Sequence, residues 1–244
     1  MFVHGSFGWG LDTFPEQRAL ADAYEVVLLD RRGYGASPSV EDPGWHHDVD
    51  DLLAWIDGGA HLVGQSYGGV VCLLAAAERP ERVRSLTVIE PVAASVAMDH
   101  PHVQAFAAAM RACAGRGKEM TASEFLTAWH RALGRSGPIE TDEFGPEEWR
   151  AVETTRAERP AVDAPIDTET LATARWPKLI VEGGWPTSTD KDLLRDATAD
   201  ICRTLHREMG GQLVEFEGSA HNPQLEEPAR FNRMLRTLWD STGR

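Results

Sequence analysis

The segment Gly64-Gln65-Ser66-Tyr67-Gly68 most limits how this chain can fold. It follows an apolar stretch, residues 61–63, and precedes an apolar run, residues 70–77, with the spacing of a buried helix. A strand that turns sharply into a helix strains the residue at the apex, so the positions two before and two after it must be small. Glycine at both positions predicts a strand, a tight turn and a helix with Ser66 at the apex, which is the pattern of a nucleophile elbow.

Short apolar runs alternate with helical segments over most of the chain. Six runs have the length of buried strands, at 2–3, 26–29, 62–63, 86–89, 179–181 and 213–216. Segments with helical spacing separate most of them, at 13–23, 45–57, 67–79, 190–208 and 224–239. Because such alternation produces a parallel sheet covered on both faces, the sequence predicts an α/β fold with a doubly wound, mostly parallel sheet of about six strands.

The alternation is interrupted once, between residues 91 and 177. This stretch has helical patches at 103–114, 123–133 and 146–158 and no convincing strand, so we expect a helical cap inserted into a core formed by residues 1–90 and 178–244. The predicted cap is rich in aromatic residues. These either line an apolar pocket over Ser66, with Trp129 as a candidate substrate contact, or pack the cap onto the core.

Composition narrows the class of partner. The 244 residues can bury one sizeable core, and a net charge of −14 disfavours binding to nucleic acids and anionic membranes. Cys72, Cys113 and Cys202 have no metal-ligand spacing, and the first residues lack the pattern of a secretion signal. We therefore expect a cytoplasmic protein that acts on a small apolar molecule without a metal or an organic cofactor.

Four motifs, His4-Gly5, residues 30–37 (DRRGYGAS), the segment around Ser66, and Gly218-Ser219-Ala220-His221, occur in the order typical of the α/β-hydrolase fold. The chain resembles the serine hydrolase branch of that superfamily over nearly all of its length outside the cap. The resemblance implies that Ser66 is the nucleophile and His221 its general base. It also implies that the backbone amides of Ser6 and Tyr67 form the oxyanion hole, with Phe7 as an alternative donor.

The acid of the expected triad departs from the commonest pattern of this superfamily. Counting from Gly183, the usual position holds Pro186, and the carboxylates of Asp190 and Asp192 come only later, at the expected start of a helix. A second solution in the fold places the acid after the strand that follows the elbow helix. Glu90 occupies that position, so we predict Glu90 as the acid and keep Asp190 and Asp192 as alternatives.

Glu90 and the segment 183–187 (GGWPT) resemble the corresponding parts of the zearalenone lactone hydrolases of this fold. The resemblance favours an apolar or aromatic ester or lactone as substrate, cleaved through an acyl-enzyme on Ser66, with Phe7 and Trp185 as further candidate substrate contacts. A carbon–carbon bond hydrolase or lyase and a biosynthetic thioesterase would use the same triad. A third alternative is a ligand-binding protein with little turnover.

Only residues 1–3 precede the first recognisable motif, His4-Gly5. Relative to the superfamily, the first two strands are missing, which would expose the apolar strand 26–29 at a sheet edge. We expect this edge either to pair with a second copy, giving a homodimer, or to be covered by chain upstream of Met1 in the natural protein.

Overall fold

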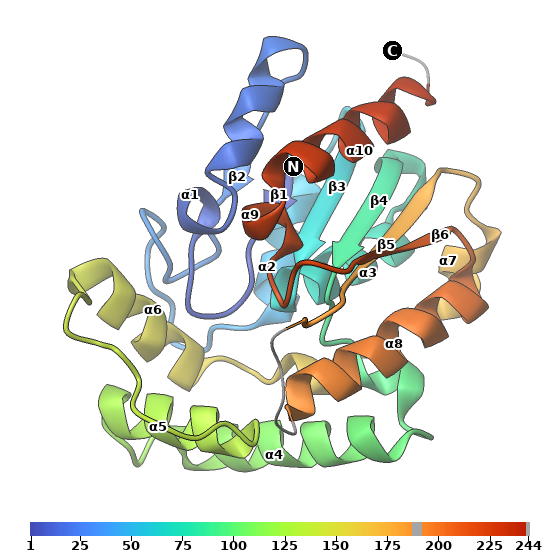
Figure 1. Ribbon diagram of the computed structural model, residues 1–244. Coiled ribbons are helices and arrows are strands. Elements are labelled where there is room, and N and C mark those ends of the chain that lie inside the picture. Colours follow the sequence, from blue (N-terminus) through green and yellow to red (C-terminus); the bar gives the residue numbers. More distant parts are fainter. Residues whose placement is uncertain (187–191, 243–244) are drawn as a thin grey trace.

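One parallel sheet of six strands forms the centre of the molecule in the computed structural model, which describes residues 1–186 and 192–242 (Figure 1). The strand order is β2-β1-β3-β4-β5-β6, and each neighbouring pair is parallel. This confirms the predicted α/β fold class. The strands are β1 (Phe2–Val3), β2 (Leu28–Leu29), β3 (Ala60–Gln65), β4 (Val83–Ile89), β5 (Lys178–Gly183) and β6 (Gln212–Phe216).

Helices cover both faces of the sheet, and each face has its own apolar core. One core joins the sheet to α2 (Trp45–Trp55), α3 (Tyr67–Glu78) and α8 (Leu193–Met209). The other joins it to the 3₁₀ helix η1 (Glu16–Asp22) and α10 (Pro228–Asp240). The three central strands are buried on both faces, which explains their nearly continuous apolar sequence.

The chain between β4 and β5 is helical, and its first part lies beyond one end of the sheet (Figure 1). It contains α4 (Pro101–Gly117), α5 (Ala122–Ala132), α6 (Pro146–Ala157) and the short α7 (Thr168–Thr173). Helices α4, α5 and α6 pack on one another, and α4 also packs on α8, whereas α7 packs on α3 and α8. The last part of the predicted insertion therefore lies with the layer that covers the sheet.

Two predicted helices are each divided by a proline. The predicted helix 13–23 is instead α1 (Gly10–Thr13) followed by η1, and the break falls at Phe14-Pro15. The predicted helix 224–239 is α9 (Pro223–Glu226) followed by α10, and the break falls at Glu227, directly before Pro228. A proline disfavours helical geometry in the residue before it, and its ring supplies no N–H for the preceding turn.

The sheet also fixes two features that bear on function. Strand β2 lies at an edge with half-buried residues, where the sequence predicts it, and its pairing with a second copy stays a prediction. All six strands end at the same side of the sheet, where α/β folds commonly place their ligands. In the part of the chain that the structure describes, no helix is both long and apolar enough to cross a membrane.

Candidate active site

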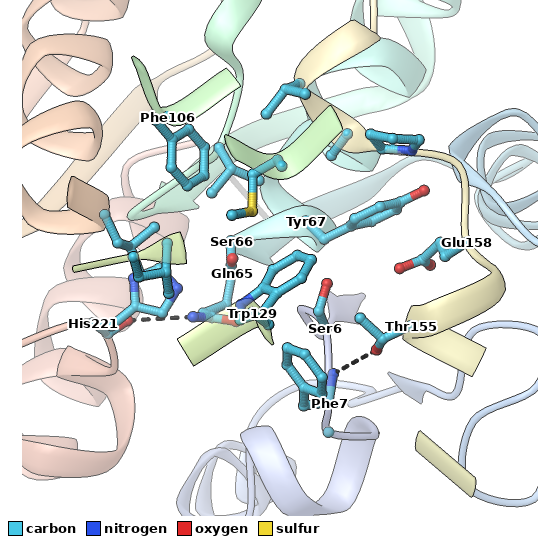
Figure 2. Close-up of a pocket in the computed structure, with 18 of the residues that line it drawn as sticks. Ser6, Phe7, Gln65, Ser66, Tyr67, Phe106, Trp129, Thr155, Glu158 and His221 are labelled. Atoms are coloured by element: carbon cyan, nitrogen blue, oxygen red, sulfur yellow. Dashed lines mark hydrogen bonds between the residues drawn. The ribbon is translucent and has the colours of Figure 1, made fainter. Parts of the chain in front are cut away.

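Ser66 lies at the sharp turn between β3 and α3, with φ 53° and ψ −115°. Its amide donates to the carbonyl of Ile89 at the end of β4 (2.8 Å), which ties the turn to the neighbouring strand. The residue is 9% exposed, and its side chain faces a cavity above the sheet (Figure 2). Left-handed backbone in a non-glycine residue persists only where the surroundings impose it.

The glycines on either side of Ser66 are required by close backbone contacts. A Cβ on Gly64 would lie 2.3 Å from the carbonyl oxygen of Gly68, and a Cβ on Gly68 would lie 2.1 Å from that of Val3. Neither contact can be relieved by a side-chain rotation, because both involve backbone atoms. The small residues deduced from the sequence are thus what allows β1, β3 and α3 to meet at the turn.

His221 lies on the loop between β6 and α9 and also lines the cavity. The side-chain amide of Gln65 donates to the carbonyl of His221 (3.2 Å) and to Oδ1 of Asn222 (3.1 Å), which holds the loop beside the elbow (Figure 2). The Nδ1 atom of His221 lies 3.4 Å from Oε2 of Glu90. The described residues contain no hydrogen bond between Ser66 and His221, and such bonds are commonly long in sites without substrate.

Glu90 follows β4 directly and is completely buried. Its Oε1 accepts the amide of Gly183 (2.8 Å), and its Oε2 accepts the hydroxyl of Thr198 (2.6 Å) as well as facing His221. A buried carboxylate with donors on both oxygens is held in one orientation. Glu90 is therefore placed to fix the position and tautomer of the His221 ring.

The alternative acids behave differently. Asp192 caps α8, because its Oδ1 accepts the amides of Leu194 (3.0 Å) and Arg195 (3.4 Å), and its Oδ2 accepts from Arg135 (2.8 Å). Both carboxylate oxygens of Asp192 are thus hydrogen-bonded, one to the first amides of α8 and the other to the guanidinium of Arg135. Asp190 lies outside the described residues.

Ser6 and Tyr67 both line the cavity, and their backbone amides have no hydrogen-bond acceptor in the described part of the chain. Tyr67 is the first residue of the twelve-residue helix α3, where amides are unpaired and the helix dipole is positive. The amide of Phe7, the alternative donor, instead donates to Oγ1 of Thr155 (3.1 Å; Figure 2). This leaves Ser6 and Tyr67 as the available pair.

All four non-glycine residues with positive φ in the described chain surround this site. They are Phe7 (65°), Ser66 (53°), Glu90 (46°) and Trp185 (50°). Each such conformation costs roughly 1–3 kcal/mol and tends to accumulate where function requires it. The concentration of strained backbone is independent support for a functional site here.

The cavity has a volume of about 310 Å³ and is mainly apolar. Ser66, Tyr67 and His221 line it, and α4, α5 and the residues after α6 supply much of the rest. Trp129 packs edge-on against Phe7, with ring centroids 5.2 Å apart, so both candidate contacts line the cavity. Its apolar surface comes mostly from Phe106, Met110, Phe125, Trp129, Leu133, Val162 and Leu194.

Trp185 does not line this cavity in the part of the chain that the structure describes. Its ring lies 6.1 Å from the ring of His221, and its amide donates to the carbonyl of Ser219 (2.9 Å). Trp185 thus packs near His221, and its role as a substrate contact stays a prediction. The sharp turn after Gly183 directs the indole toward the loop that carries the histidine.

A buried ionic cluster beside the cavity was missed from the sequence. Arg31 bonds to Asp48 (2.9 Å) and to Glu158 at the end of α6, and its guanidinium lies over the rings of Tyr34 (4.5 Å) and Tyr67 (4.2 Å). Burial raises the pKa of Glu158 to about 7, against the attraction of Arg31. The cluster links the inserted helices to the body at the edge of the cavity.

His4 has a structural place near the same cluster. Its Nε2 accepts the amide of Arg31 (3.0 Å), so its Nδ1 carries the proton donated to the carbonyl of Gly5 (2.7 Å). Burial, helped by the charge of Arg31, holds the pKa of His4 well below its ordinary value. His4 is therefore neutral and makes a hydrogen bond with each ring nitrogen, and these two bonds shape the loop that presents Ser6.

The sequence matches the model of the alpha/beta hydrolase family over residues 1–234. The chain therefore belongs to this family, which confirms the predicted superfamily and the predicted class of enzyme, an α/β-hydrolase.

Individual relatives match over shorter segments. The chain is 34% identical over 115 residues to the dihydrolipoyllysine-residue acetyltransferase component of the acetoin cleaving system of Cupriavidus necator, covering 45% of this chain and 30% of the relative. It is 34% identical over 99 residues to 2-hydroxymuconate semialdehyde hydrolase of a Pseudomonas species, covering 36% and 35%. The chain thus spans about a third of the length of these curated relatives. A thermophilic esterase from Thermogutta terrifontis has the same fold, with a TM-score of 0.70 and 22% identity over 100% of this chain and 89% of the esterase.

Proposed function

We propose that the protein is a serine hydrolase that cleaves an apolar or aromatic ester or lactone through an acyl-enzyme on Ser66. The observation that carries the proposal is the placement of three groups at the ends of parallel strands. Ser66 stands on a strained elbow, and His221 opens onto the same cavity and contacts the buried carboxylate of Glu90 at 3.4 Å. A nucleophile, a base and a group that orients the base are the parts that acyl transfer requires.

The reaction begins when Ser66 Oγ attacks the carbonyl carbon and His221 Nε2 takes the hydroxyl proton. The negative charge that develops on the carbonyl oxygen is stabilised by the amides of Ser6 and Tyr67. His221 then gives the proton to the leaving oxygen, and the acyl group stays on Ser66. A water molecule, deprotonated by His221, then attacks the acyl carbon; the bond from that carbon to Ser66 Oγ breaks, His221 returns the proton to Ser66 Oγ, and the acid is released. Glu90 stabilises the charged imidazole in both halves.

The cavity supports an apolar acyl or alcohol group. Its lining is dominated by aromatic and aliphatic side chains, and the charged groups at its edge are largely paired, as in Arg135 with Asp192 and Arg31 with Glu158. An uncharged substrate gains from burial against this surface, at about 25 cal/mol for each Å² of apolar area removed from water. The third alternative, a ligand-binding protein with little turnover, would be favoured by an incomplete triad. The contact of buried Glu90 with His221 supplies a third member and so weakens that alternative.

One alternative has a specific observation in its favour. The similarity to a 2-hydroxymuconate semialdehyde hydrolase extends over 99 residues. The substrate in that relative's name, a semialdehyde, is not an ester. A carbon–carbon bond hydrolase would use the same three groups. Only substrate trials separate it from the ester hydrolase proposed first, because the two reactions share the same catalytic set.

The test is covalent labelling by a fluorophosphonate, read by intact mass on the wild type, on Ser66→Ala and on Ser123→Ala. Ser123 is an exposed serine on α5, and it controls for labelling of unactivated hydroxyls. We expect one adduct per chain in the wild type and in Ser123→Ala and none in Ser66→Ala. A panel of 4-nitrophenyl acetate, hexanoate and benzoate would then show kcat/KM increasing with the size of the apolar acyl group. A folded wild type that neither labels nor hydrolyses any ester would contradict the proposal.

A further inference from the structure

The loop that presents Ser6 is held in a strained conformation by a helix far away in the sequence. Phe7, the next residue, has φ 65°, which is unfavourable for a bulky side chain. Its amide donates to Oγ1 of Thr155 on α6, 148 positions away (3.1 Å; Figure 2). Because Thr155 is 5% exposed, water does not readily replace that bond.

Thr155 is itself fixed by a chain of hydroxyl groups. Its Oγ1 lies 2.9 Å from the hydroxyl of Tyr34, which donates to Oε2 of Glu158 (3.1 Å). While Glu158 is ionised it can only accept, and since each hydroxyl has one proton the donors then have a single direction: Phe7 amide to Thr155, Thr155 to Tyr34, and Tyr34 to Glu158. At the end of the chain, the guanidinium of Arg31 donates to the other carboxylate oxygen of Glu158, Oε1. All the donors along it are satisfied, so the acceptor at Thr155 Oγ1 is held in place for the Phe7 amide.

We propose that Thr155 is a positioning residue for the oxyanion hole: by accepting the Phe7 amide it holds the Ser6–Phe7 loop in its left-handed conformation and aims the Ser6 amide at the developing oxyanion. Without this acceptor, Phe7 gains by relaxing to negative φ, and that rotation moves the adjoining peptide units. A displacement of about 1 Å in a catalytic group can reduce a rate on the order of 10²-fold. The helix α6 thereby couples the inserted segment to the chemistry over Ser66.

The neighbouring residue gives a matched control. Thr154 lies on the same helix, is 9% exposed, and uses its hydroxyl to donate to the carbonyl of Gly33 (2.8 Å). Thr154→Val and Thr155→Val therefore make the same chemical change at two similarly buried positions, and only the second removes the acceptor of the Phe7 amide. Thr155→Ser keeps that acceptor. Thr155→Ala removes it with a smaller side chain and serves if the valine variant does not fold.

The first readout does not depend on activity. Selective ¹⁵N labelling of the eight phenylalanines gives a small set of amide signals, and that of Phe7 is identified by its loss in Phe7→Leu. We expect hydrogen exchange at Phe7 to accelerate at least about tenfold in Thr155→Val, and to stay within about threefold of wild type in Thr155→Ser and Thr154→Val. Unchanged exchange in Thr155→Val would overturn the proposal.

The second readout tests the link to catalysis and rests on the proposed function. Removing one donor from an oxyanion hole typically costs about 10²–10³-fold in rate, so a displaced donor in Thr155→Val should lower kcat about 10- to 100-fold with little change in KM. Thr155→Ser should restore kcat to within about threefold of wild type, and Thr154→Val should differ as little. Faster exchange at Phe7 with no loss of kcat beyond that of Thr154→Val would overturn the catalytic role. An inactive wild type would defeat the proposed function instead, and the exchange result would still decide whether Thr155 holds the loop.

Discussion

Replacing Glu90 by glutamine tests the proposed acid with almost no change of shape. The amide oxygen should stay at the Oε1 position, because the Gly183 amide there can only donate. The NH₂ group then faces Thr198 and Nδ1 of His221. Thr198 can turn its proton to the carbonyl of Leu194 (2.9 Å) and accept in its place. At His221, however, a donor at Nδ1 favours the tautomer protonated at Nε2, which cannot take the proton of Ser66.

The magnitude follows from the geometry. With the His221 and Glu90 atoms 3.4 Å apart and an effective dielectric constant of ~20, two unit charges attract by about 5 kcal/mol. Spreading the charges over two oxygens and two nitrogens lowers this to roughly 4 kcal/mol. At 1.36 kcal/mol per factor of ten, we expect labelling and ester hydrolysis to slow about 10³-fold.

The assay is the second-order rate constant for fluorophosphonate labelling, with the thermal midpoint measured on the same samples. Glu182→Gln is the matched control, since Glu182 is 6% exposed at the end of β5 and makes no contact with His221 in the described chain. It should label at the wild-type rate. If Glu90→Gln labels within about threefold of wild type while folded, or if Glu182→Gln slows as much, the tautomer argument is wrong.

Two further predictions concern stability. The pKa of Glu158 is raised to about 7 by burial, so the native state holds its proton more tightly than the unfolded chain does. The stabilisation is complete below the unfolded value and is lost as pH rises to about 7, so urea denaturation from pH 4.5 to 8 should show wild type losing about 3 kcal/mol relative to Glu158→Gln. A difference that does not vary with pH would refute this. Gly68→Ala should lower stability by about 1–3 kcal/mol or prevent folding, because its Cβ meets the Val3 carbonyl, whereas Gly58→Ala has no neighbour within 4 Å and should change stability by less than about 0.5 kcal/mol. Equal urea midpoints for the two alanine variants would contradict the close-packing argument.

The parts of the fold that could be predicted depend on local pattern. The apolar runs at β3, β4 and β5 indicate their own burial, and the glycines around Ser66 indicate a tight turn, so these strands and the elbow could be predicted from the sequence. Where prediction missed, a proline had ended a periodic helix, as at Phe14-Pro15. Periodicity alone does not detect a single break of this kind.

The missed residues of the site share another property, because their partners lie far away in sequence. Thr155 meets Phe7 148 positions away, Thr198 meets Glu90 108 positions away, and Gln65 meets the His221 loop 156 positions away. A threonine or glutamine carries no local mark of such a contact. Trp185 was easier to single out, because a large aromatic residue close to a catalytic motif in sequence is conspicuous, and its ring packs near His221.

The pairing of Gln65 with Ile89 has a wider consequence. Ser66 and Glu90 are the next residues on these two adjacent parallel strands, and Ser66 donates directly to Ile89. The distance between the proposed nucleophile and the proposed acid is therefore set by the backbone register of β3 and β4, which belong to the central sheet. The helices that enclose the cavity can diverge in sequence without altering that distance. Evolution could thus exchange the walls that select a substrate while inheriting the reactive centre intact.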